Sequence, residues 1–199
     1  VGGGSLVYAA VLLEPHDAFF DDPQWSDITD WKRELAPYYD LAGRMLGRAT
    51  APADTPADGV LAAVARHFGV EDTHEPTQIG VFLGEPEKRV PDPFFGGAGP
   101  ECVGCKQCGG CMVGCRFEAK NTLDRNYLYL AEALGARVFA EHAAVDLVEE
   151  DGRYRVTTER PGAWVRKRRR TFTADRVVFA AGALRTTRLL LRLQEAGRL

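Results

Sequence analysis

Five cysteines stand close together in the middle of this chain, and their clustering constrains it more than any other feature. They are Cys102, Cys105, Cys108, Cys111 and Cys115, and the sequence of 199 residues has no other cysteine. A disulfide-stapled scaffold would spread its cysteines so that they join distant loops. The clustering instead favours a metal site, a redox site or a tightly folded local loop in a reducing compartment.

The spacing of the last four cysteines, Cys-x2-Cys-x2-Cys-x3-Cys, matches a bacterial ferredoxin run in which Arg116 replaces the usual Pro. In two-cluster ferredoxins the fourth cysteine of such a run ligates the other cluster, so a single cluster normally needs a remote cysteine, which this sequence lacks. Zinc is less favoured, because two Cys-x2-Cys pairs that bind zinc are usually a dozen or more residues apart. The residues leave three interpretations open: an iron–sulfur cluster, a free-thiol loop, and a zinc site or disulfide.

Hydrophobic periodicity predicts helices in the first part of the chain and mostly strands after residue 137. The predicted helices cover residues 31–46, 60–68, 121–134 and 183–193, with Asp30 as the N-cap of the first. The predicted strands cover residues 138–140, 144–149, 154–159, 165–173 and 176–179, and residues 6–13 form either a strand or a short helix. Asp151-Gly152 is a typical hairpin turn, and residues 84–101 form a long loop. This pattern indicates an α/β fold.

Two glycine-containing motifs are candidates for binding a phosphate-bearing ligand. Gly2-Gly3-Gly4-Ser5 lets backbone N–H groups approach a pyrophosphate without a Cβ atom in the way. In residues 177–184, a β-branched run ends in Ala181-Gly182 and opens a helix, whose N-terminus suits a phosphate. The first motif also fits a flexible loop, and the second a tight strand–helix turn without a ligand.

Residues 114–128 are the most distinctive string, Gly-Cys-Arg-Phe-Glu-Ala-Lys-Asn-Thr-Leu-Asp-Arg-Asn-Tyr-Leu. From the residues alone they predict a helix start, with Asn121 or Thr122 as the cap and Asp124 in the first turn against the helix dipole.

In their order along the chain, the three motifs at residues 2–5, 114–128 and 177–184 resemble the glucose–methanol–choline (GMC) oxidoreductases, and in particular their cholesterol-oxidase-like branch. The resemblance implies a partial Rossmann-like FAD-binding domain with part of a substrate cap. It implies FAD-dependent oxidation of the CH–OH group of a sterol, sugar or aliphatic alcohol, in some relatives with an iron–sulfur cluster that passes electrons to an acceptor protein. The implied FAD contacts are Gly2, Gly3, Gly4, Ser5, Asn121, Thr122, Ala181 and Gly182, with a backbone contact of Val145 to the adenine. Many relatives continue Tyr-Ala-Asn where this chain has Tyr8-Ala9-Ala10.

The order of the motifs predicts a central piece of such an enzyme. Residues 1–15 would form a flavin-side glycine loop, 16–100 a helical cap segment, 101–120 the cysteine-rich loop, and 121–199 the helix, strands and terminal βα unit of the FAD domain. A Gly-x-Gly-x-x-Gly loop is expected upstream and the catalytic histidine downstream, so we assign no catalytic residue to this chain. The chain alone is expected to be inactive and to bind FAD poorly.

Charge argues against a nucleic-acid partner, and hydropathy argues against a membrane-spanning segment. The net charge is −3, and we interpret the basic run Arg166–Arg170 as a solvated turn rather than a nucleic-acid site. No apolar stretch approaches the roughly 20 residues that a membrane span requires. No signal peptide is recognisable, which favours a cytoplasmic location.

Overall fold

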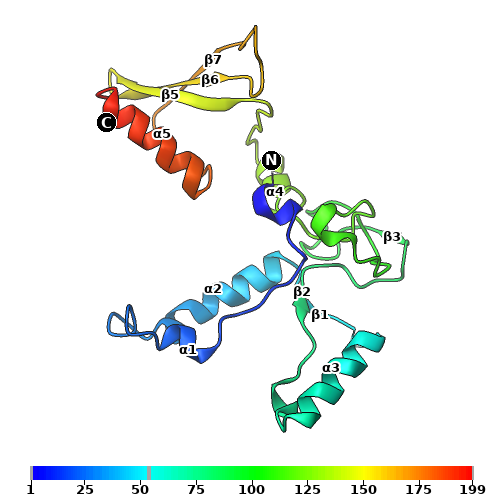
Figure 1. Ribbon diagram of the computed structural model, residues 1–199. Helices are drawn as coiled ribbons and strands as arrows, with labels where there is room; N and C mark the ends of the chain where they lie inside the picture. Colours follow the sequence, from blue (N-terminus) through cyan, green and yellow to red (C-terminus); the bar gives the residue numbers. More distant parts are fainter. Residues whose placement is uncertain (1, 53–54, 199) are drawn as a thin grey trace. The chain divides into compact units, whose positions relative to one another are not determined.

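The computed structural model describes residues 2–52 and 55–198 of a chain that divides into two compact units, Val1–Ala136 and Arg137–Leu199. Each unit contains both helices and strands (Figure 1), so the predicted α/β class is confirmed. None of the described helices is long and apolar enough to cross a membrane.

The two long helices of the first unit begin at residues that bind the free N–H groups of the first turn. Helix α2 (Trp31–Met45) is capped by Asp30, whose carboxylate accepts a hydrogen bond from the Arg33 N–H, as predicted. Helix α3 (Pro56–His67) begins before the predicted residue 60, because Thr55 and Asp58 form a capping box. The other helical segments are short: η1 (Gly3–Leu6), α1 (Asp17–Phe20), η2 (Glu71–Thr73), η3 (Gly110–Val113) and α4 (Tyr127–Ala133).

Short antiparallel strand pairs join distant parts of the first unit. Strand β1 (Ala49–Thr50) pairs with β2 (Gln78–Ile79), and β3 (Arg89–Val90) pairs with β4 (Cys102–Val103). Isolated bridges connect Val11 with Ile79 and Val81 with Lys120. The N-terminal segment, the residues around β2 and the residues behind the cysteines therefore lie side by side.

The second unit is a three-stranded antiparallel sheet with one helix packed on it (Figure 1). Its strands are β5 (Ala143–Glu150), β6 (Arg153–Glu159) and β7 (Arg170–Ala174), and its helix is α5 (Ala183–Glu195). Leu189 and Leu193 of α5 are buried against Leu147 of β5. The predicted turn Asp151-Gly152 joins β5 to β6, with positive φ angles of 54° and 73°, as hairpin turns of this length require.

Several predicted boundaries are wrong for identifiable reasons. Residues 138–140 and 176–179 form no strand, because no strand of the described residues pairs with them. The predicted strand 165–173 is shortened to β7, because residues 160–169 form a loop that the Arg160 N–H closes on the Lys167 carbonyl. Residues 6–13 form neither the predicted strand nor the predicted short helix: η1 ends at Leu6, a turn and two bends follow, and a single bridge joins Val11 to β2.

Candidate functional site

A buried lysine, Lys120, connects the N-terminal segment to the cysteine loop. Its side chain is 1% exposed, and its Nζ donates hydrogen bonds to the carbonyl oxygens of Leu6 (2.9 Å), Tyr8 (3.1 Å) and Cys111 (2.9 Å). Burial lowers the pKa of Lys120, although the nearby Cys111 and Cys115 act in the opposite direction. The three carbonyls take the place of water around the ammonium group, which makes its burial tolerable.

Two buried asparagines hold the C-terminal end of α2. The Nδ2 groups of Asn121 and Asn126 donate hydrogen bonds to the Met45 carbonyl oxygen at 3.0 Å and 3.3 Å. The last carbonyls of a helix have no partner within the helix, and these two amides supply one for Met45. Asn126 also caps α4, because its Oδ1 accepts from the Tyr127 N–H. The predicted helix start at residue 121, with Asn121 or Thr122 as its cap, is therefore wrong, and residues 121–126 serve to join α2 to α4.

The glycine cluster presents an unobstructed stretch of backbone. Gly2 and Gly3 have φ angles of 88° and 57°, the left-handed region that favours glycine. No atom lies within 4 Å of where a Cβ on Gly3 or Gly4 would stand. Ser5 anchors the cluster, because its Oγ donates to the Gly2 carbonyl (2.6 Å) and accepts from the Leu123 N–H (3.0 Å).

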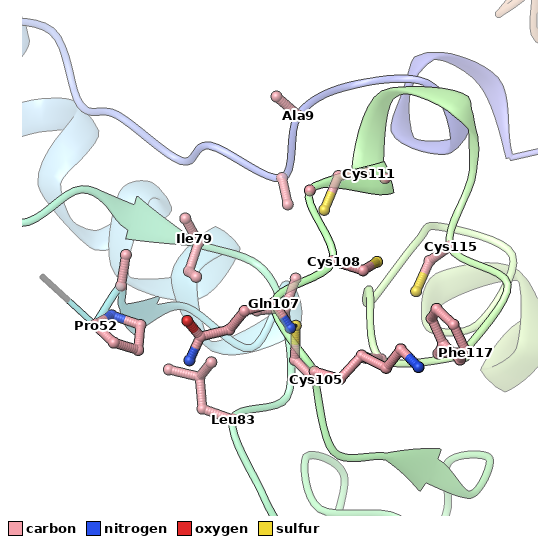
Figure 2. A pocket seen from close by; sticks show the side chains of 17 residues that line it. Ala9, Pro52, Ile79, Leu83, Cys105, Gln107, Cys108, Cys111, Cys115 and Phe117 are labelled. Carbon is pink, nitrogen blue, oxygen red and sulfur yellow. The ribbon is translucent and has the colours of Figure 1, made fainter. Parts of the chain in front are cut away.

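Four cysteines line a cavity of about 240 Å³ in the first unit. Figure 2 shows Cys105, Cys108, Cys111 and Cys115 around this space, with Ile79, Leu83 and Ala9 also on its wall. The fifth cysteine, Cys102, is buried in β4 and does not belong to the lining. The cavity is therefore a mainly apolar space lined by thiols.

All five thiols are free. Burial raises the pKa of Cys102 and of Cys111, and the neighbouring Cys105 and Cys115 raise that of Cys111 further. Across residues 2–52 and 55–198, no group of three or more His, Cys, Asp or Glu side chains is arranged to hold a metal ion. The iron–sulfur and zinc interpretations thus gain no support from the described part of the chain.

The remaining predicted FAD contacts lie in the second unit. The register of β5 against β6 shifts between Ala144 and Asp146, so Val145 has no partner residue on β6. Gly182, with a φ of 78°, precedes α5 and has no atom within 4 Å of a Cβ position. The Ala181 N–H donates to Thr186 Oγ1 at 3.1 Å, which fixes the turn into the helix.

Gly2–Ser5, Asn121, Thr122 and all five cysteines thus belong to the first unit, whereas Val145, Ala181 and Gly182 belong to the second. The roles of Lys120, Asn126 and the Met45 carbonyl were not predicted from the sequence. Lys120 and Asn126 both lie in the distinctive string 114–128, so a signal was present. This string was interpreted only as the start of a local helix. The actual partners of the Lys120 and Asn126 side chains include residues in distant parts of the sequence, which a local pattern does not indicate.

Comparison with known proteins identifies the family. Residues 100–193 match the model of the GMC oxidoreductases. Over the whole chain, the sequence is 50% identical to a cholesterol oxidase of Mycobacterium tuberculosis (strain CDC 1551 / Oshkosh) and 42% identical to a cholesterol oxidase of Acinetobacter baumannii. The chain spans 36% of the mycobacterial relative and 38% of the Acinetobacter relative. No solved structure gives a significant match.

The chain belongs to the GMC oxidoreductase family. Within it, the chain is similar to proteins named cholesterol oxidase, as the three sequence motifs implied. GMC oxidoreductases generally bind FAD, and the mixed helices and strands are consistent with part of a Rossmann-like FAD-binding domain.

Proposed function

We propose that this chain forms the flavin-facing part of an FAD-dependent oxidoreductase that oxidises the CH–OH group of a sterol. The observation that carries the proposal is the 50% identity, over the whole chain, to a relative named cholesterol oxidase. When bound, FAD accepts a hydride from the alcohol carbon while a base takes the hydroxyl proton. In this proposal residues 1–199 bind and orient the cofactor, and the base comes from elsewhere in the enzyme.

The glycine cluster fits a close approach by the cofactor. The space beside Gly3 and Gly4 is open, and Ser5 fixes the neighbouring backbone to Gly2 and Leu123. Backbone N–H groups without a Cβ atom above them suit a pyrophosphate or a flavin edge. Gly2–Ser5 are therefore our first candidates for FAD contacts.

Asn121 and Thr122 are candidates of different kinds. The Asn121 amide is engaged by the Met45 carbonyl, so we propose that this residue acts by positioning its neighbours. Thr122 lies on the wall of a second cavity of about 540 Å³, together with Leu6 and Lys120. Thr122 is therefore our candidate in this pair for a direct contact with the cofactor.

The second unit, taken by itself, has two features that suit a nucleotide-bearing ligand. Val145 lies at the register shift of an edge strand, where its backbone is free of a β6 partner. A backbone contact to adenine, as the family resemblance implies, needs such a free group. Gly182 opens α5 without a side-chain cap, and the N-terminus of a helix of this length favours a phosphate.

The iron–sulfur electron-transfer module is the alternative function that the cysteine spacing raises. Four thiols line one cavity, but among the described residues no group of three or more His, Cys, Asp or Glu side chains is arranged to hold a metal ion. Iron and acid-labile sulfide, assayed after purification without oxygen, separate the two functions. A flavin-containing protein free of iron and sulfide supports the proposed oxidoreductase without a cluster.

A chimera tests the proposed function directly. In it, this chain replaces the segment of the Mycobacterium tuberculosis relative to which it aligns, and the flavin absorbance of the purified protein is recorded. The proposal predicts bound FAD. A folded chimera without flavin, judged by circular dichroism, contradicts it.

A pair of glycine variants tests the assigned contact in the same chimera. Gly4→Val places a side chain in the open space beside the cluster and should lower FAD retention about tenfold or more, the loss expected when a close backbone contact is blocked. Gly59→Val on α3 is the matched control, because its Cβ position is equally open. Equal FAD retention by both variants would remove the glycine cluster from the site.

A further inference from the structure

We propose that the loop between β6 and β7, residues 160–169, binds the surface of an anionic lipid bilayer. This inference goes beyond the proposed oxidation and does not depend on it. It rests on the composition of the loop, on its exposure and on a basic cavity at its base.

Two adjacent apolar side chains lie at the tip of the loop in full contact with water. Trp164 is 97% exposed and Val165 is 92% exposed. The Arg160 N–H donates to the Lys167 carbonyl at 2.8 Å and closes the loop behind them. Tryptophan is enriched at the level of lipid head groups, where its ring contacts acyl chains and its N–H remains hydrated. The tip therefore has the composition of an interfacial anchor.

Basic side chains surround this apolar tip. Residues 160–170 contain no acidic residue and six basic ones: Arg160, Arg166, Lys167, Arg168, Arg169 and Arg170. Two carboxylates from outside the loop, Glu141 and Glu159, form ion pairs with three of the six. Arg166 and Arg168 form no ion pair with any residue that the structure describes. The loop thus carries a net positive charge, which anionic head groups attract.

A basic cavity lies at the base of the same loop. It has a volume of about 360 Å³, and its lining includes Arg160, Arg168, Arg169, Arg170, His142 and Glu141. The Arg170 guanidinium is held 4.8 Å and 4.9 Å from the centres of the Phe139 and Phe172 rings. Guanidinium groups bind phosphates and carboxylates through paired hydrogen bonds. The cavity suits the head group of an anionic phospholipid.

The apolar tip favours a bilayer over a nucleic acid. Single-stranded nucleic acids stack successive bases on successive aromatic rings, whereas here an aliphatic side chain, Val165, follows the single Trp164. A bilayer uses both side chains, because each can enter the boundary between head groups and acyl chains. The combination of basic residues with exposed Trp and Val is typical of a segment that lies on a membrane surface.

Sedimentation with lipid vesicles tests the inference without FAD or substrate. We expect the 199-residue chain to bind phosphatidylcholine vesicles that contain phosphatidylserine, and to be released by salt. The variant Arg166→Glu/Arg168→Glu should lose about tenfold or more of its partitioning, because each basic residue near an anionic surface contributes measurably. The matched control Arg137→Glu/Arg176→Glu makes the same charge change at exposed positions outside the loop and should bind almost normally. Equal loss in both variants, or no preference for phosphatidylserine, overturns the inference.

Quenching of tryptophan fluorescence by brominated lipids tests the orientation of the bound chain. Trp164 should be quenched in phosphatidylserine-containing vesicles, and Trp164→Phe should bind but lose the quenching. Quenching that persists in Trp164→Phe would assign the contact to Trp25 or Trp31 and overturn the inference. Retention on single-stranded RNA, lost in Arg166→Glu/Arg168→Glu and without vesicle binding, would also overturn it in favour of a nucleic acid.

Discussion

The Nζ of Lys120 lies 2.9 Å from the carbonyl oxygen of Cys111, and this hydrogen bond ties the cysteine loop to the buried centre of the first unit. The same ammonium group binds the carbonyls of Leu6 and Tyr8. One side chain therefore sets the position of the segment after the glycine cluster relative to the thiol-lined cavity.

Replacing Lys120 by methionine should destabilise the first unit by about 2–4 kcal/mol, because three buried carbonyls lose their donor. Urea unfolding followed by the fluorescence of Trp25 and Trp31 measures the change. Lys88→Met is the matched control: Lys88 is 61% exposed in its ion pair with Glu85, so its loss should cost less than about 1 kcal/mol. Equal stability of the two variants would show that Lys120 does not hold the unit together.

Asp92 organises the loop before the cysteines and should make its stability depend on pH. Burial raises the pKa of Asp92, but hydrogen bonds from the N–H groups of Phe94, Gly99, Phe95 and Gly97 outweigh this and lower the pKa below its ordinary value of 3.8. The hydrogen bonds to the Asp92 carboxylate therefore stabilise the folded chain fully at pH values above 3.8. This stabilisation is lost as the pH falls through the lowered pKa of Asp92.

Asp92→Asn should therefore be less stable than the wild type by about 1–3 kcal/mol at pH 7. The difference should shrink only in strongly acidic solution, below the ordinary pKa of the carboxyl group. Chemical denaturation of both proteins across the acidic range measures it. A difference that is already lost in mildly acidic solution would contradict the assigned hydrogen bonds.

The cysteines should differ in their reactivity. Cys108 is exposed, whereas Cys102 is 4% exposed and burial raises the pKa of its thiol. Since the thiolate is the reactive form, iodoacetamide should modify Cys108 at least about tenfold faster than Cys102 at neutral pH. Mass spectrometry of peptides after a short pulse measures both rates in one sample, with the unfolded chain as the control. Equal rates in the folded protein would contradict the burial of Cys102.

Gly104 should tolerate no side chain. A Cβ at this position would lie 1.9 Å from the carbonyl oxygen of Glu85, a backbone atom that cannot move unless the surrounding chain moves with it. Gly104→Ala should cost roughly 1–3 kcal/mol, the range for overpacking. Gly110→Ala is the control, because its nearest atom, the Cys108 Sγ, would lie at an ordinary 3.5 Å. Thermal unfolding compares the two variants, and a stable Gly104→Ala would refute the close approach.

Local signals in the sequence predicted correctly those features that depend on residues only a few positions away in the chain. Asp30 caps α2, and Asp151-Gly152 turns between β5 and β6, because both depend on backbone groups only a few residues away. The boundary of α4 could not be predicted in this way. Asn121 looks like a helix cap in the sequence, but a carbonyl 76 positions earlier, that of Met45, binds its amide.

The candidate site was only partly predictable for the same reason. The motifs located the glycine cluster, the cysteines and the string 114–128. They did not reveal that Lys120 joins them, since its three acceptors are backbone carbonyls and leave no trace in the residue types. Ala10 illustrates a further limit: its φ of 67° is a left-handed conformation that Asn adopts more readily than Ala, and nothing in the neighbouring residues predicts it.

The most direct test of the proposed function is reduction of the flavin by a sterol. The chimera with the Mycobacterium tuberculosis relative is loaded with FAD, freed of oxygen and mixed with cholesterol, while the flavin absorbance is followed. The account predicts that the absorbance bleaches as the alcohol is oxidised. The account is contradicted if cholesterol does not reduce the flavin of a folded, FAD-loaded chimera, although it reduces the flavin of the unaltered relative in the same experiment.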